Sequence, residues 1–112
     1  MDRNSDTDNT FFVKVKNKLL KIDPKEIYLI KAIGDYVAIH TINQKYIVHS
    51  TMKNIMSQLA TTHFIRVHQS YIIRLDKISV INRTNCIVNN EEVPISKAER
   101  KNLLSRINII GT

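Results

Sequence analysis

Short β-rich stretches separated by turn-forming residues most constrain what this 112-residue chain can fold into. The chain has only two glycines and two prolines. Asparagine and aspartate must therefore make most of its turns, because both tolerate left-handed backbone conformations and form local side-chain turns. Many short strands between turn signals are typical of an antiparallel β architecture. The stretches that we expect to be strands are residues 11–16, 18–22, 27–33, 36–42, 45–49, 64–67, 78–81, 86–88 and 92–95.

Two stretches carry the pattern of helices instead. Residues 51–60 place apolar side chains at helical spacing, with Ser50 or Thr51 available as the N-cap. Those apolar side chains are Met52, Ile55, Met56 and Leu59. Ser96 and Glu99 have the spacing of a capping box, which predicts that a second helix starts at Ser96. The predicted fold class is mainly β, with short antiparallel strands, a short middle helix and a C-terminal helix.

The charge of the chain is unevenly distributed. The formal net charge is +7 at pH 7, yet the first ten residues carry three aspartates and one arginine. We expect residues 1–10 to be a disordered leader or a linker remnant, and residues 11–112 to form one basic domain. Such a domain attracts polyanions, so nucleic acid and an anionic membrane both qualify as partners. A basic solvated surface without any ligand is the alternative.

The residues that could carry chemistry form no recognisable catalytic or metal-binding motif. The histidines closest in sequence, His63 and His68, are five residues apart with no cysteine nearby, unlike the ligands of a typical zinc site. The single cysteine, Cys86, is expected to pack as a small apolar residue, and the lack of any possible internal disulfide fits the cytoplasm. No Gly-rich phosphate loop, nucleophile elbow, secretory signal or membrane-spanning run is present. We therefore expect no enzymatic activity, no cofactor and no membrane contact.

Positive side chains in the C-terminal half lie next to polar loops, which suggests phosphate contacts. They are Arg66, Arg74, Lys77, Lys97, Arg100 and Lys101. A helix that starts at Ser96 offers free backbone N–H groups and the positive end of its dipole, although Glu99 favours an ordinary capped helix. Proteins that bind single strands use aromatic stacking platforms, whereas this chain has only three Phe and four Tyr. Duplex DNA is therefore the favoured nucleic acid.

Three segments, in order, carry a resemblance to a known family. They are residues 27–37 (IYLIKAIGDYV), residues 64–78 (FIRVHQSYIIRLDKI) and residues 93–96 (VPIS) followed by a basic helix. Together they resemble the LytTR DNA-binding domains, the output modules of many bacterial response regulators, over about residues 11–110. The resemblance implies small stacked sheets and sequence-specific binding of duplex DNA by loops. It also implies a cytoplasmic transcriptional regulator. Full-length members of the family usually carry a receiver domain or a membrane segment before this module, so the chain is expected to be either an excised output domain or a short stand-alone regulator.

The resemblance further implies which loops enter successive major grooves. They are the turn Gly34-Asp35-Tyr36, the turn His68-Gln69-Ser70 and the helix entrance Ser96-Lys97-Ala98. Gln69 is the candidate base reader, because its amide can donate and accept at adenine in one bidentate contact. Ser70 suits a phosphate oxygen. Paired sites are common in the family, so two copies of an otherwise monomeric domain are expected to meet on DNA.

Several positions leave alternatives open. Lys97 or Lys101 could reach phosphate or a guanine edge, and Ala98, where many relatives carry a long cation, could touch a thymine methyl group. Asp35 could read a cytosine amino group or only hold its turn, and His68 could touch DNA or only pin its loop. Arg66 could contact phosphate or pair with Asp76. The rival to sequence-specific DNA binding is a polyanion-binding or protein-interaction module without sequence preference.

Overall fold

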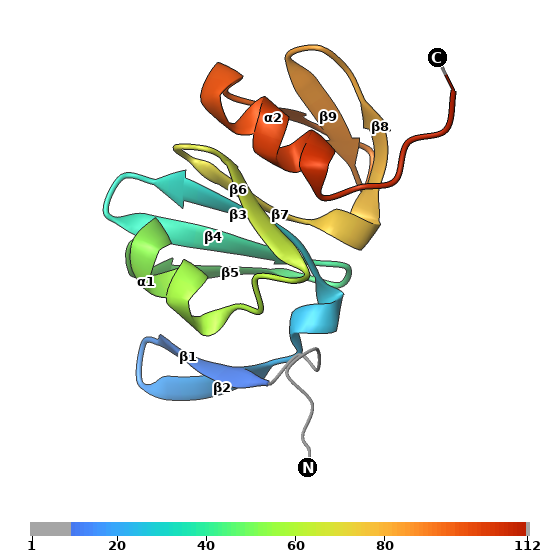
Figure 1. Ribbon diagram of the computed structural model, residues 1–112. Helices are drawn as coiled ribbons and strands as arrows, with labels where there is room; N and C mark the ends of the chain where they lie inside the picture. The colour runs from blue at the N-terminus through green and yellow to red at the C-terminus, as the bar shows by residue number, and fades with distance from the viewer. Residues whose placement is uncertain (1–9, 112) are drawn as a thin grey trace.

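The computed structural model describes residues 10–111, which fold mainly into antiparallel sheets (Figure 1). The predicted leader, except for Thr10, lies outside the described residues. The strands and α-helices, in chain order, are β1 (Phe11–Val15), β2 (Lys18–Ile22), β3 (Ile27–Ile33), β4 (Tyr36–Thr41), β5 (Lys45–His49), α1 (Met52–Gln58), β6 (Phe64–His68), β7 (Tyr71–Arg74), β8 (Ile78–Ile81), β9 (Asn85–Val88), β10 (Glu91–Pro94) and α2 (Lys97–Ser105). Two 3₁₀ turns, η1 (Pro24–Glu26) and η2 (Leu75–Lys77), precede β3 and β8. The predicted fold class is confirmed.

Two-residue turns close the β9–β10 and β3–β4 hairpins at positions where the sequence predicts turns. Asn89 and Asn90 join β9 to β10 with φ values of 50° and 68°, as a type I′ turn requires. Gly34 and Asp35 join β3 to β4, and Gly34 has a φ of 56°. A Cβ atom at Gly34 would meet nothing within 4 Å, so the backbone conformation and not space favours glycine there.

The strands form three separate antiparallel sheets. A five-stranded sheet has the order β5-β4-β3-β7-β6, a three-stranded sheet has the order β10-β9-β8, and β1 pairs with β2 alone. Figure 1 shows the β1–β2 hairpin below the five-stranded sheet and the three-stranded sheet with α2 above it. This arrangement confirms the expectation of small stacked sheets.

The five-stranded sheet is covered on both faces, which explains its continuous apolar runs. One face contributes Ile30 and Ile72 to a core shared with the β1–β2 hairpin and α1. The opposite face contributes Leu29 and Ile73 to a core shared with the three-stranded sheet and α2. Neighbouring residues of one strand therefore enter different cores, so an alternation of apolar and polar side chains does not arise.

The predicted helices form with small changes at their ends. Thr51, not Ser50, caps α1, because its Oγ1 accepts the N–H of Asn54 at 3.0 Å. The helix α2 begins after Ser96, as predicted. No helix among residues 10–111 is long and apolar enough to cross a membrane. The strand β7 was not among the predicted strands.

Arg74 corrects one expectation about the cationic side chains. It is buried with only 5% exposure, so the prediction that it contacts phosphate is wrong. Its Nε donates to Oδ1 of Asp76 at 2.8 Å and its Nη1 donates to the carbonyl of Pro24 at 3.2 Å. Its guanidinium also lies 5.3 Å from the centre of the Phe64 ring. Arg74 thus joins η1, η2 and β6, and its charge is used within the fold.

Cys86 provides a test of the second core. It is fully buried, as expected, and burial raises the pKa of its thiol to about 11. At pH 8 we expect the folded domain to react with a thiol reagent at least about 100-fold more slowly than the unfolded chain, whose cysteine has a pKa of about 8.5. Colour development with Ellman's reagent, with and without denaturant, measures both rates, and equal rates would contradict a closed core.

Candidate nucleic-acid interface

Two backbone hydrogen bonds hold the three predicted loops side by side. The N–H of Ala32, near the end of β3, donates to the carbonyl of Ser70 at 2.9 Å. The N–H of Ser96, just before α2, donates to the carbonyl of Val67 at 2.8 Å. The middle loop is thereby fixed to both of its neighbours. In Figure 1 the β3–β4 turn, the β6–β7 turn and the start of α2 all lie along the left edge of the molecule.

The middle loop is braced by its own side chains. Nδ1 of His68 accepts the N–H of Ser70 at 3.0 Å, and Nε and Nη2 of Arg66 donate to the carbonyl of Gln69 at 3.2 and 2.6 Å. The bulge between Arg66 and His68 opens the ladder at this point. His68 therefore pins its loop, and contact with DNA through its other ring nitrogen stays a prediction. Of the two alternatives left open for Arg66, the pair with Asp76 is not formed, because Asp76 binds Arg74.

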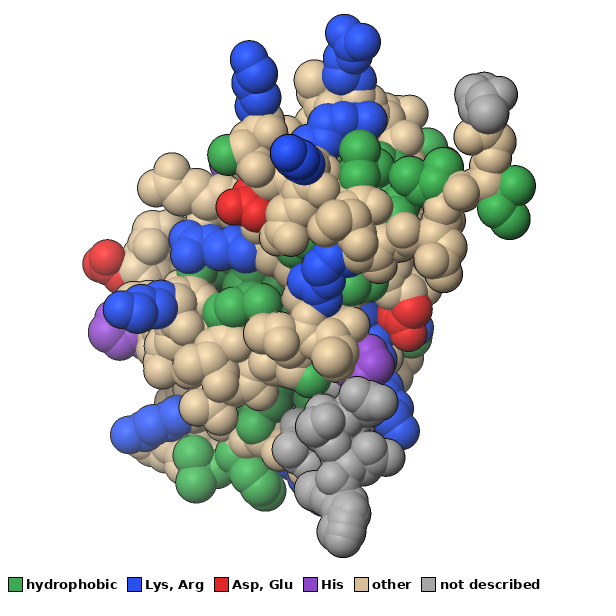
Figure 2. All heavy atoms as spheres, viewed as in Figure 1, with side chains coloured by type: hydrophobic (Ala, Val, Ile, Leu, Met, Phe, Trp, Pro, Cys, Tyr) green, Lys and Arg blue, Asp and Glu red, His purple; other side chains and the backbone are tan. Residues whose placement is uncertain are grey.

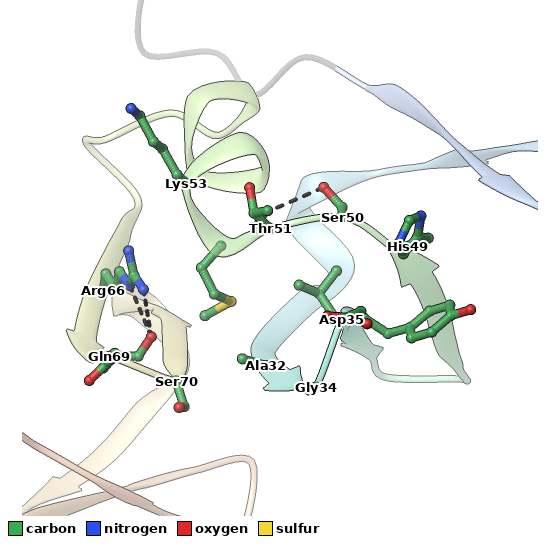
Figure 3. Close-up of a pocket in the computed structure, with 13 residues that line it drawn as sticks. Ala32, Gly34, Asp35, His49, Ser50, Thr51, Lys53, Arg66, Gln69 and Ser70 are labelled. Atoms are coloured by element: carbon green, nitrogen blue, oxygen red, sulfur yellow. Dashed lines mark hydrogen bonds between the residues drawn. The ribbon is translucent and has the colours of Figure 1, made fainter.

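Gln69 stands exposed between two hollows of the surface. The first hollow, about 490 Å³, lies between the β3–β4 turn, the β6–β7 turn and the start of α1. Figure 3 shows Arg66, Gln69 and Ser70 on one side of this hollow and Gly34 and Asp35 opposite them. The second hollow, about 440 Å³, lies between the β6–β7 turn and the start of α2. Both hollows include Gln69 in their lining, so its amide can reach a ligand from a ridge between them.

The β3–β4 turn presents polar and aromatic groups at the far side of the first hollow. Asp35 and Tyr36 are both exposed. The Tyr36 ring packs against the His49 ring with their centres 5.1 Å apart. This contact joins the turn to the end of β5, directly before α1.

The start of α2 differs from the predicted capping box. Oγ of Ser96 accepts the N–H of Glu99 at 3.2 Å, as predicted. The Ser96 N–H, which a full capping box would give to the Glu99 carboxylate, bonds Val67 instead. Oε1 of Glu99 instead accepts a hydrogen bond from Nδ2 of Asn102 at 3.4 Å. The Ser96 N–H therefore anchors the start of α2 to Val67, directly before the middle loop, and does not bond within its own helix.

The cationic side chains of α2 face in different directions. Lys97, Ala98 and Lys101 are exposed on the first two turns of the helix. Arg100 instead donates through Nη1 to the carbonyls of Asn82 and Arg83 in the β8–β9 turn. Its guanidinium braces that turn, and its predicted contact with DNA stays a prediction.

Positive charge exceeds negative charge along this row of loops. Lys53, Arg66, Lys97 and Lys101 lie on or beside it, against the carboxylates of Asp35 and Glu99. Figure 2 shows Lys and Arg side chains distributed along the same left edge. Sequence reasoning missed Lys53 and His49. The packing of α1 brings Lys53 to the first hollow, and the pairing of β5 with β4 places His49 opposite Tyr36 there.

Comparison with known proteins identifies the family of this chain. The protein-family model of the LytTr DNA-binding domain matches residues 17–108 of this chain. This chain belongs to the LytTR family. The LytTR domain is 25% identical over 103 residues to the sensory transduction protein LytT of Enterococcus faecalis, covering 87% of this chain and 43% of that protein. It is 28% identical over 82 residues to the transcriptional regulatory protein LytR of Staphylococcus aureus, covering 73% of this chain and 33% of that protein.

The fold of this LytTR domain also matches a solved structure. The LytTr DNA-binding domain of a putative methyl-accepting/DNA response regulator from Bacillus cereus superimposes with a TM-score of 0.74. The sequence identity is 16%, and the match covers 87% of this chain and 94% of that one. The chain spans less than half the length of the two curated relatives above.

The brace on the middle loop can be tested with Arg66→Lys. Lysine keeps the charge but lacks the fork that donates twice to the Gln69 carbonyl, so we expect the loop to lose about 1 kcal/mol of local stability. Exchange of the Ser70 amide hydrogen, followed by NMR, should become about fivefold faster. Arg83→Lys in the exposed β8–β9 turn is the matched control. Unchanged exchange at Ser70 would show that the brace contributes little.

Proposed function

We propose that this LytTR domain binds duplex DNA sequence-specifically, as the output domain of a bacterial transcriptional regulator. The observation that carries the proposal is the pair of backbone hydrogen bonds, from Ala32 to Ser70 and from Ser96 to Val67, that align three loops on one edge. The three loops enter successive major grooves on one side of the duplex. Loops fixed to sheets can position side chains as a recognition helix does, because their backbones are held at both ends.

Gln69 contacts a DNA base, and the residues beside it contact the phosphate backbone of the DNA. Its side chain is exposed at the tip of a turn whose main chain is held by Arg66 and His68. A carboxamide presented in this way can contact adenine N6 and N7 together. Ser70 and Ser96 offer hydroxyl groups beside it, which suit phosphate oxygens.

Phosphate contacts supply most of the affinity. The exposed side chains of Lys97 and Lys101 lie on one face of α2, one turn apart, and Lys97 directly follows Ser96 of the second hollow. With roughly six phosphate contacts, the logarithm of the binding constant should fall with the logarithm of salt concentration at a slope of about −5. Asp35 and Ala98 have shorter side chains than these lysines. We assign Asp35 to holding its turn and Ala98 to a contact with a thymine methyl group.

The names of the relatives support a regulatory role. One is a transcriptional regulatory protein and another is a sensory transduction protein, and both are more than twice as long as this chain. We propose that this domain likewise acts in transcription regulation, responds to a receiver domain of the full-length protein and pairs on DNA with a second copy. It carries out no enzymatic reaction in this role.

Selection of binding sites from a random duplex library at about 150 mM salt tests the proposal, since this salt concentration screens weak surface contacts. We expect a defined motif with two half-sites about one helical turn apart. Salt-sensitive binding without any motif, with heparin competing as well as DNA, would overturn the proposal and favour a polyanion-binding module instead.

The variant Gln69→Ala isolates base reading. We expect it to lose preference at one base position, at a cost of about 1–3 kcal/mol on the selected site and little on scrambled duplex. Gln58→Ala, in the exposed last turn of α1, is the control. Fluorescence anisotropy measures the affinity for both duplexes. Equal loss of affinity on the selected and the scrambled duplex would show that Gln69 does not read a base.

The variant Lys101→Ala isolates a phosphate contact. We expect it to weaken binding to matched and scrambled duplex alike and to reduce the salt slope by about one unit. Lys25→Ala is the control, because Lys25 is exposed in η1, away from the three loops. A titration series over salt concentration gives the slope, and an unchanged slope would exclude Lys101 from the contacts.

A further inference from the structure

We propose that the β1–β2 hairpin is a fourth DNA contact, which binds phosphates of the duplex beyond the three loops. This inference rests on the proposed function and extends its footprint. The contact is electrostatic and carries no sequence preference, because lysine ammonium groups recognise phosphate as point charges.

The hairpin is a strongly basic element. Four lysines and no acidic residue lie between Phe11 and Ile22, and all four are exposed. They are Lys14, Lys16, Lys18 and Lys21. Lys16 has a φ of 57° in the turn that joins β1 to β2, which places positive side chains at the tip of the hairpin.

The tip of the hairpin lies on the edge of the molecule that carries the three loops. Figure 1 shows the β1–β2 turn on the left, below the β3–β4 turn. A third hollow, about 570 Å³, is lined by Lys14 and Lys16 of the hairpin and by Tyr36 and His49 of the sheet. Tyr36 and His49 also line the first hollow, so one continuous surface leads from Gln69 to the hairpin.

The hairpin is a fixed platform and not a loose arm. Val13 and Ile22 are buried in the core that also contains Met52 and Ile55 of α1. Lys14 alternates with Val13 and Val15 along β1, so burial of the apolar face turns the lysine outward. A duplex seated on the three loops would therefore meet these charges without any ordering of the backbone.

Membership of the family does not assign this contact. The region matched to the LytTR family begins at residue 17, after β1 and both lysines of the third hollow. The contact is thus a property of this chain, argued from the placement of its own charges.

The double variant Lys14→Gln/Lys16→Asn tests the contact, since asparagine tolerates the positive φ at residue 16. Binding is measured on the selected site with long flanks and on the same site with either flank removed. On the long duplex the slope of the logarithm of the binding constant against the logarithm of salt concentration should be about two units shallower for the variant than for wild type. Between 50 and 200 mM salt the variant should therefore lose about tenfold less affinity than wild type does. On the duplex that lacks the flank on the hairpin side, variant and wild type should bind alike.

The control variant is Lys25→Gln/Lys45→Gln, which removes two exposed lysines from η1 and from the start of β5, at the opposite ends of the strands from the β3–β4 turn. We expect it to keep the wild-type slope on every duplex. If the double variant unfolds on heating at a lower temperature than wild type, Lys14→Gln alone should still lose about one unit of slope.

The outcomes separate this inference from the proposed function. A wild-type slope for the hairpin variants on the long duplex, with the selected motif intact, would overturn only the hairpin contact. Failure of the wild-type domain to select any motif would overturn the proposed function itself.

Discussion

The hydrogen bond from the Ser96 N–H to the Val67 carbonyl is the contact on which the arrangement of the candidate interface depends. It joins the start of α2 to the edge strand of the five-stranded sheet, across a long separation in sequence. Further along α2, Leu103 enters the second core and Arg106 donates to the carbonyl of Phe64 at 3.4 Å, so the helix is tied to β6 at both ends. Because the bond between Ser96 and Val67 uses only main-chain atoms, it occupies no side chain of the neighbouring loops, and Gln69 remains exposed.

The central sheet explains why the proposed contacts fall on loops and not on a sheet face. Both of its faces are buried against other elements, so only its rims remain open to a large ligand. The rim that contains the β3–β4 and β6–β7 turns also receives α2 and the tip of the β1–β2 hairpin. Hollows lie on either side of Gln69, so this rim has a ridge between two depressions. Such a shape can fit a partner that itself has grooves.

Local patterns in the sequence predicted most of the elements. Residues 18–22, 27–33, 45–49 and 78–81 were predicted as strands with the ends that the structure has, because turn residues bound each of them. The strand β7 was missed because it has only four residues and because Ile72 and Ile73 enter opposite cores, so it offers neither length nor alternation as a signal. Arg74 was misassigned because a list of charges does not tell which cation is buried against a carboxylate.

The sequence by itself determined the β-rich class, the asparagine turns, the cap at Ser96, the burial of Cys86 and the resemblance to the LytTR family, and it narrowed the cap of α1 to Ser50 or Thr51. Only the tertiary structure decided which loops lie together, that Arg66 and Arg100 brace loops, and that Lys53 and His49 border the first hollow. The physical reason is range. Turn and cap preferences act between residues a few positions apart, whereas the bonds from Ala32 to Ser70 and from Ser96 to Val67 exist only once the sheets have assembled.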